Sequence, residues 1–429
     1  MSRLARSSFA LMLSTVATAG LGMFFWAEAA WRFAPAEVGR ASAGSSAILL
    51  LATLGQLAFT SVYARVLPTM AAGRARFVAA GYALVALASL LLTAGFLAAG
   101  FSDGFMTTSS ATALGFGLAV ATTAISVVQD GALVALGRAG WVPVKNAALA
   151  VARVALLPVL AGTTVHHPVL IAWALPTAVA VAVPSLLLLG RADPARATDR
   201  GEVPTRREIV RLIGGQYANS VVNAVIMFAP PVLVTAVLGP EANAVFFLPW
   251  TIATALLGLL WNVVVPFVVE AGADRANLGA NVRLMIRTGT LITLGGGAVL
   301  FLAGPVLLVI AGSTYAHDGA PVLRLLAAAL PFAAIGTFFN AAELVRLRSS
   351  VSLLTKTLAA VLFLGAAVPA MRAAGVTGAA TAYLVSQVVV GLILLRPVIA
   401  WYREHAGPAR PPAGRGGFTP VPATGDAAP

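Results

Sequence analysis

Long apolar runs alternate with short polar connections along almost the whole chain. A helix needs about 20 mainly apolar residues to cross the hydrocarbon core of a bilayer. Reading the sequence with that window predicts twelve transmembrane helices. The expected spans are 8–31, 42–64, 77–100, 110–136, 142–163, 168–189, 209–238, 243–269, 285–311, 321–343, 351–371 and 375–400. The first run is longer than the apolar core of a secretory signal peptide, so it is also predicted to be a span.

The composition supports this prediction. Hydrophobic residues make up 59% of the 429 residues and charged residues only 10%, whereas a soluble protein is about a quarter charged. The expected fold class is therefore an all-α polytopic membrane protein. The chain has no cysteine, which excludes disulfides and cysteine-ligated metals. Its net charge of +13 is scattered between apolar runs, so the basic patch of a nucleic-acid-binding protein is not expected.

The basic residues predict the orientation of the chain. Arg and Lys gather at the two termini and in the connections after the even-numbered spans, and they are rare in the other connections. Positively charged loops remain in the cytoplasm. We therefore expect a multi-pass protein of the cytoplasmic (inner) membrane with both termini in the cytoplasm.

The most polar segment, Gly190–Arg211, is a basic linker that follows the sixth span and divides the chain into two groups of six spans. The expected domains are an N-lobe at 1–195, a C-lobe at 196–405 and a disordered cytoplasmic tail at 406–429. The tail is rich in Gly, Pro and Ala and has little to bury.

The two halves also share a pattern. "PAEVGRASAGSSAILLLATLG" (Pro35–Gly55) and "PEANAVFFLPWTIATALLG" (Pro240–Gly258) each begin with Pro and an acidic residue and end in Leu-Gly. They enter the second and the eighth span, which are equivalent positions of the halves. Internal duplication of this kind is typical of transporters.

Asp130 and Arg153 lie deep inside expected spans, where charges are costly and usually have a role. Asp130 and Arg153 lie in adjacent spans at similar expected depth, so we expect them to form a pair. Two interpretations remain open. The pair is structural, or Arg153 faces a cavity and binds the anionic part of a substrate while Asp130 orients it or exchanges a proton. A guanidinium suits phosphate because its planar fork donates two parallel hydrogen bonds. Lys145 is expected to extend to the lipid headgroups.

Further polar residues lie within the spans. Gln216, Asn219 and Asn223 share one face of the seventh span, and with Asn262 of the eighth they are predicted to bind substrate. The candidates for a coupling ion, either a proton or sodium, are Asp130, Glu28 and Glu343.

Structural roles are open for both glutamates. Trp31 and Arg32 follow Glu28, which suits an anchor at the membrane interface. Arg346 follows Glu343 closely enough for a salt bridge at the cytoplasmic end of its helix.

The chain carries no constellation typical of an enzyme. The four histidines have no carboxylate at a metal-binding spacing, and the phosphate loop G-x-x-x-x-G-K-[ST] is absent. We therefore predict no enzymatic activity, no cofactor and no metal.

Several stretches resemble the flippase branch of the MOP superfamily, the MATE-like Wzx-type proteins of polysaccharide biosynthesis. They are Pro35–Pro68, "QDGALVALGRAGWVPVKN", "VLGPEANAVFFLPWTIATALLGLLWNVVVPFVVEAGAD" and "GSTYAHDGAPVLRLLAAALP". The resemblance implies two six-helix lobes in a V around a central cavity. It also implies alternating access, in which a lipid-linked saccharide moves from the inner leaflet to the outer one.

The function expected from these observations is that of a flippase for a polyprenyl-diphosphate-linked oligosaccharide used in O-antigen or exopolysaccharide export. Its expected partners are this anionic substrate, membrane lipids and, in the membrane, a glycan polymerase and glycosyltransferases. Two alternatives remain. One is a MATE-type drug/cation antiporter, and the other is a membrane scaffold for glycan-assembly enzymes that transports nothing.

Overall fold

The computed structural model describes residues 20–70, 73–106, 109–189, 206–273, 277–346 and 348–406. The described residues are almost entirely helical, and they begin with a helix over residues 20–32. The later helices are α2 (Pro35–Gly55), α3 (Phe59–Val66), α4 (Arg74–Ala98), α5 (Ser110–Ala135), α6 (Trp141–Ala161), α7 (Pro168–Leu189), α8 (Arg206–Leu238), α9 (Pro240–Ala273), α10 (Leu278–Thr290), α11 (Gly296–Val309), α12 (Ser313–Val345) and α13 (Ser349–Ala406). A π-helical turn, Leu291–Gly295, joins α10 to α11.

Ten helices within the described ranges are long and apolar enough to cross a membrane. One of them, α13, holds the last two expected spans, because its backbone leaves the helical region at Ala374 and Gly375. The helix over residues 20–32 is the described part of the first span. The expected all-α polytopic fold with about twelve transmembrane helices is therefore confirmed. The predicted tail and most of the basic linker lie outside the described residues.

The second expected span is broken. Helix α2 ends at Gly55 and α3 begins at Phe59, and Leu57 and Ala58 between them adopt positive φ angles of 49° and 56°. Non-glycine residues rarely adopt this conformation. The chain therefore changes direction inside the span, which its apolar pattern could not indicate.

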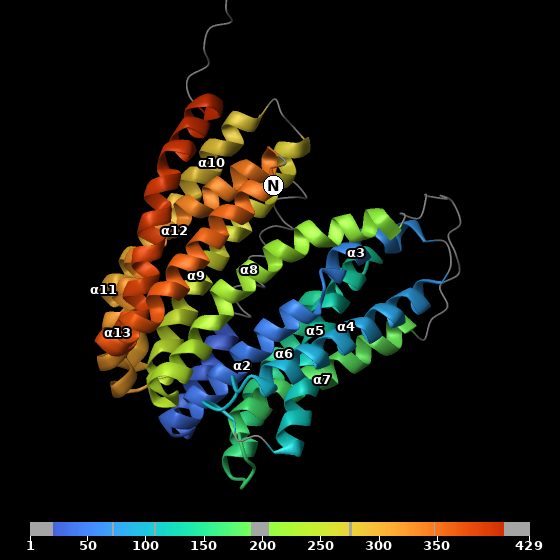
Figure 1. The fold of residues 1–429 in the computed structure, drawn as a ribbon, viewed down its shortest axis with the longest axis vertical. Helices are drawn as coiled ribbons and strands as arrows, with labels where there is room; N and C mark the ends of the chain where they lie inside the picture. Colours follow the sequence, from blue (N-terminus) through green and yellow to red (C-terminus); the bar gives the residue numbers. More distant parts are fainter. Residues whose placement is uncertain are drawn as a thin grey trace, which may run out of the picture.

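The helices form two lobes arranged as a V (Figure 1). One lobe contains α2–α7 and the other α9–α13, and the lobes converge at one end and separate towards the other. Helix α8 lies between them and contacts α2 and α3 on one side and α9 and α13 on the other. It begins at the separated end, where α13 also ends (Figure 1).

The lobes meet along α2, which packs against both α8 and α9. Its buried residues 41–47 are all Ala, Ser or Gly, and small side chains let membrane helices approach closely. At Gly39 a Cβ atom would stand 1.7 Å from the carbonyl oxygen of Pro240. Asn243 Nδ2 donates to the Gly39 carbonyl at 3.0 Å and to Ser42 Oγ at 2.9 Å. We call these four residues the interlobe contact.

Candidate functional site

A buried ion pair joins α5 to α6 in the first lobe. Lys145 Nζ lies 2.5 Å from Asp130 Oδ1, and the lysine side chain is 3% exposed. The ammonium also donates to the carbonyl oxygen and the hydroxyl of Ser126, at 3.0 Å each. The prediction that Lys145 extends to the lipid headgroups is therefore wrong, because the ammonium is held inside the lobe by three oxygen atoms.

The expected pair between Asp130 and Arg153 does not form. Asp130 lies about 8 Å from the end of α5, whereas Lys145 and Arg153 lie about 6 Å and 18 Å from the start of α6, at 1.5 Å per residue. Depth therefore pairs the carboxylate with Lys145. The sequence prediction did not consider Lys145 as the partner of Asp130, because it expected the ammonium at the lipid headgroups.

Arg153 is held at the α6–α7 interface. Its Nε donates to the Trp173 carbonyl at 2.9 Å, and its Nη2 donates to Thr177 Oγ1 at 3.0 Å. The guanidinium carbon lies 4.1 Å from the centroid of the Trp173 ring, within the range of a cation–π contact. Helix α6 packs mainly on α7, so Arg153 lies away from α8, the helix between the lobes. A role for Arg153 in substrate binding stays a prediction.

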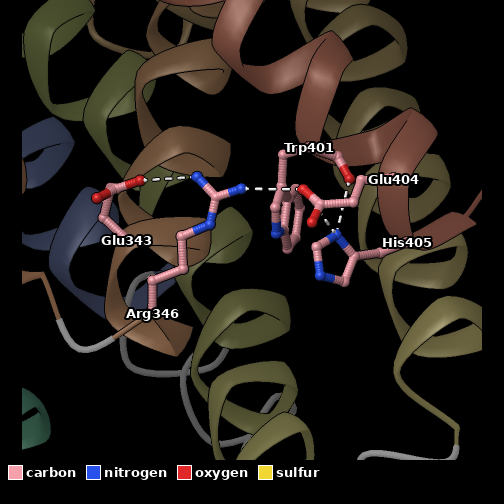
Figure 2. Close-up of polar contacts among 5 residues, drawn as sticks. All are labelled: Glu343, Arg346, Trp401, Glu404 and His405. Atoms are coloured by element: carbon pink, nitrogen blue, oxygen red, sulfur yellow. Dashed lines mark hydrogen bonds and ion pairs between the residues drawn. The ribbon is translucent and has the colours of Figure 1, made fainter.

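The two glutamates proposed as coupling-ion sites form salt bridges. Glu28 Oε1 lies 3.0 Å from Arg32 Nε. Glu343 lies 3.2 Å from Arg346, which also lies 3.3 Å from Glu404 near the end of α13. Figure 2 shows Arg346 between the two carboxylates, with His405 beside Glu404. This confirms the salt-bridge interpretation of Glu343, and ion coupling at either glutamate stays a prediction.

The predicted polar face of the seventh span lies on α8. The side chain of Gln216 lies outside the described residues, and Asn219 and Asn223 occupy the same helix. Asn223 is exposed and lines a cavity of about 130 Å³ in the C-lobe. Asn262 does not line this cavity; its Nδ2 is buried on α9 and has no hydrogen-bond partner within the described ranges.

We call this the C-lobe cavity. Helices α8, α9, α12 and α13 supply its walls, and its polar and aromatic lining residues are Asn223, Trp261, Thr337, Asn340, Thr355, Lys356, Tyr383 and Gln387. The ammonium of Lys356 lies 5.7 Å from the centroid of the Trp261 ring. Lys356 was not among the residues predicted from the sequence, although a lysine inside the expected span 351–371 was a signal for it.

Charge pairing within the lobes is unequal. Among the described residues, each buried or half-buried carboxylate has a basic partner: Glu28 with Arg32, Glu37 with Arg40, Asp130 with Lys145 and Glu343 with Arg346. No carboxylate within the same ranges lies within ion-pair distance of Lys356 or Arg153. The described parts of both lobes therefore carry surplus positive charge at membrane depth. No group of three metal-binding side chains occurs in these parts.

The fold matches solved transporter structures. A multidrug resistance MATE family transporter of the MOP superfamily in an inward-facing conformation aligns with a TM-score of 0.64 and 18% identity, over 90% of this chain and 95% of that one. A multidrug resistance MATE family transporter of the MOP superfamily in an outward-facing conformation aligns with a TM-score of 0.63 and 17% identity, over 92% of this chain and 96% of that one. The lipid II flippase MurJ in an inward closed conformation has a TM-score of 0.70 and 14% identity, over 92% and 90%.

No protein-family model and no curated protein sequence matches the chain. The sequence identities to the solved structures are low, so the likeness concerns the fold. The chain therefore shares its fold with the MATE transporters of the MOP superfamily and with the lipid II flippase MurJ.

Proposed function

We propose that the protein is a flippase that moves a polyprenyl-diphosphate-linked oligosaccharide across the inner membrane by alternating access, for export of a cell-surface polysaccharide such as O-antigen or exopolysaccharide. The observation that carries the proposal is the surplus of positive charge within the lobes. Lys356 lines the C-lobe cavity and lacks a carboxylate partner in the described structure, and a diphosphate supplies the missing negative charge. The resemblance to the lipid II flippase MurJ supports this substrate class.

A drug/cation antiporter is the second candidate, because MATE transporters of the same fold include multidrug resistance proteins. Such a protein needs free carboxylates to bind an organic cation. In the described part of this chain the buried or half-buried carboxylates already have basic partners. A cation that binds at one of these carboxylates would have to displace its base, which favours the anionic substrate.

The contacts to substrate are proposed to lie mainly on the helices where the lobes meet. Asn219 and Asn223 on α8 and Asn262 on α9 offer amide groups suited to saccharide hydroxyls and phosphate oxygens. Gln216 extends this set by its position on α8. If a proton or sodium ion drives the cycle, it has to release one of the ion pairs of Glu28, Asp130 or Glu343.

The decisive measurement is the pool of radiolabelled lipid-linked oligosaccharide in cells that lack the protein. Loss of a flippase should raise the amount of this intermediate in the inner leaflet, because synthesis continues while export stops. Loss of a scaffold for the assembly enzymes should lower it. A pool that falls would reject the flippase, and export of the organic cation tetraphenylphosphonium by the purified protein in liposomes would favour the antiporter.

The proposed orientation places both termini and the basic linker in the cytoplasm. The basic connections indicate this, and in the structure α8 begins and α13 ends at the same, separated end of the V (Figure 1). Alkaline phosphatase fused at Ala195 or after Ala400 should be inactive, and green fluorescent protein fused there should fluoresce. An active phosphatase at either site would reverse the orientation.

A further inference from the structure

We propose that the C-lobe cavity is a binding site for a phosphate-type oxyanion, with Lys356 as its charged ligand. The site would take either the diphosphate of a lipid or a free inorganic phosphate. The first case rests on the proposed function, and the second is independent of it.

The first argument is that Lys356 has no carboxylate partner among the residues that the structure describes. Its ammonium has a ring contact with Trp261 at 5.7 Å, and the residues that line the cavity include no Asp or Glu. Lys145, the other lysine of the chain, is held by a carboxylate and two further oxygens. A lysine at membrane depth is costly without a counter-charge. The ligand that completes this site is therefore an anion.

The second argument is the supply of hydrogen-bond donors around the ammonium. Ser352 Oγ donates to Asn340 Oδ1 at 2.7 Å, which fixes the amide and leaves its Nδ2 as a donor. The amides of Asn223 and Gln387 also line the cavity and add further N–H donors, whereas the hydroxyls of Thr337 and Thr355 donate to backbone carbonyls of their own helices. An oxyanion accepts several such bonds at once, and bonds to a charged acceptor are stronger than neutral ones.

The size and the position of the cavity limit the ligand. Its volume of about 130 Å³ is well below the roughly 300–1,000 Å³ of pockets for drug-sized molecules, so it suits a phosphate group and excludes an oligosaccharide. Exposed Asn223 belongs to its wall. Asn223 lies on α8, which contacts both lobes. The ligand can therefore enter the cavity from the side that α8 forms.

Leu257, Val390 and Leu394 line the apolar part of the cavity. An apolar wall beside a cation is suited to a phosphate ester with a hydrocarbon substituent. We therefore expect a prenyl diphosphate to bind more tightly than inorganic phosphate does.

The test is a fluorescence titration of the purified full-length protein in nanodiscs. Trp261 serves as the reporter, because an anion at Lys356 changes the charge beside its ring. The probes are farnesyl diphosphate, inorganic pyrophosphate, inorganic phosphate, farnesol and tetraphenylphosphonium. We expect a saturable change with the phosphate probes and none with the other two, and the change should disappear in Trp261→Phe.

The variants Lys356→Gln and Lys356→Arg separate binding from folding. Lys356→Gln should weaken binding of the best phosphate probe at least about tenfold, the least expected when a charged hydrogen bond is lost, whereas Lys356→Arg should retain most of the affinity. Removal of an uncompensated charge should leave the melting temperature unchanged or higher. Equal affinity in Lys356→Gln and in the parent protein would overturn the proposal, as would a response to tetraphenylphosphonium alone.

Two further outcomes identify the source of the phosphate. Tighter binding of farnesyl diphosphate than of pyrophosphate supports a lipid headgroup, and equal binding of the two supports a free anion. Flipping of a lipid-linked oligosaccharide in liposomes is measured in parallel. Lys356-dependent binding without flipping would refute the proposed function and leave the site intact, whereas flipping without Lys356-dependent binding would refute the site alone.

Discussion

Asn243 is expected to control how readily the lobes open at their converging end. Its side chain donates two hydrogen bonds across the interlobe contact, to the Gly39 carbonyl and to Ser42 Oγ. Alternating access requires this end to open, so these bonds exist in the present conformation and break in the opposite one. Asn243→Ala removes them and should shift the population towards the form that is open there.

The magnitude follows from the two bonds. Hydrogen bonds between membrane helices contribute about 0.6 kcal/mol on average and up to about 1.7, so the pair stabilises the closed end by about 1–3 kcal/mol. That range corresponds to a shift of about 5- to 150-fold in the ratio of the two conformations. In Asn243→Ala, Ser42 Oγ still donates to the Gly39 carbonyl at 3.0 Å within α2, so this carbonyl keeps one hydrogen bond. We therefore expect a shift in the lower half of the range.

The chain has no cysteine, which allows site-directed spin labelling without background. Labels at His166→Cys and His317→Cys would report the separation of the lobes at the converging end. His166 lies in the connection between α6 and α7, and His317 lies in the first turns of α12 with its side chain 91% exposed. Double electron–electron resonance should show the longer of two distance populations increase several-fold in Asn243→Ala.

Asn340→Ala is the matched control. It also removes a hydrogen bond of a buried asparagine, to Ser352, but both partners belong to the C-lobe. Its distance distribution should equal that of the parent protein, even if its melting temperature falls. An unchanged distribution in Asn243→Ala, or an equal shift in both variants, would refute the assignment of these bonds to the closed state.

Three other substitutions have defined outcomes. Lys145→Met leaves Asp130 without its base, which costs about 3–5 kcal/mol for a buried pair. We expect a loss of about 3 kcal/mol, because the Asp130 side chain is 28% exposed. Combining Lys145→Met with Asp130→Asn should restore most of the melting temperature. The lysine in Arg153→Lys cannot reproduce both hydrogen bonds of the guanidinium, so thermal melts should show that the free energy of unfolding falls by about 1–2 kcal/mol. If this variant exports glycan normally at an equal protein level, the role of Arg153 is structural. Burial lowers the pKa of His167, which lies between α6 and α7. As the pH falls through about 6.5, the unfolded chain therefore binds a proton at this histidine more readily than the folded protein does. The free energy of unfolding should decrease between about pH 7 and 5. His167→Gln should flatten that decrease.

The apolar pattern predicted the helices well because each membrane-crossing helix requires a run of fixed length. The expected span 110–136 is α5, Ser110–Ala135, and the span 142–163 is α6, Trp141–Ala161. The break at Leu57 and Ala58 was missed, since a left-handed backbone at two ordinary residues depends on the packing around them.

The candidate site was less predictable, because it depends on helix rotation and on where helices begin. Arg153 was predicted to pair with Asp130 from their expected depths. Lys145 and Arg153 are eight positions apart on α6 and face different directions, and it is Lys145 that meets the carboxylate. Lys356 lies five residues inside the expected span 351–371, but the sequence does not show which side chains it meets there. Its place beside Trp261 arises only when α9 and α13 come together.

The close fit of Gly39 against Pro240 also has a mechanical consequence. Helix α9 starts at this contact and continues for 34 residues, a length of about 50 Å at 1.5 Å per residue. While this contact remains closed, a lobe that tilts about it as a rigid body by about 10° displaces the far end of such a helix by about 9 Å. A shift of a few tenths of an ångström beside the contact therefore corresponds to a shift of several ångströms at the separated ends of the lobes.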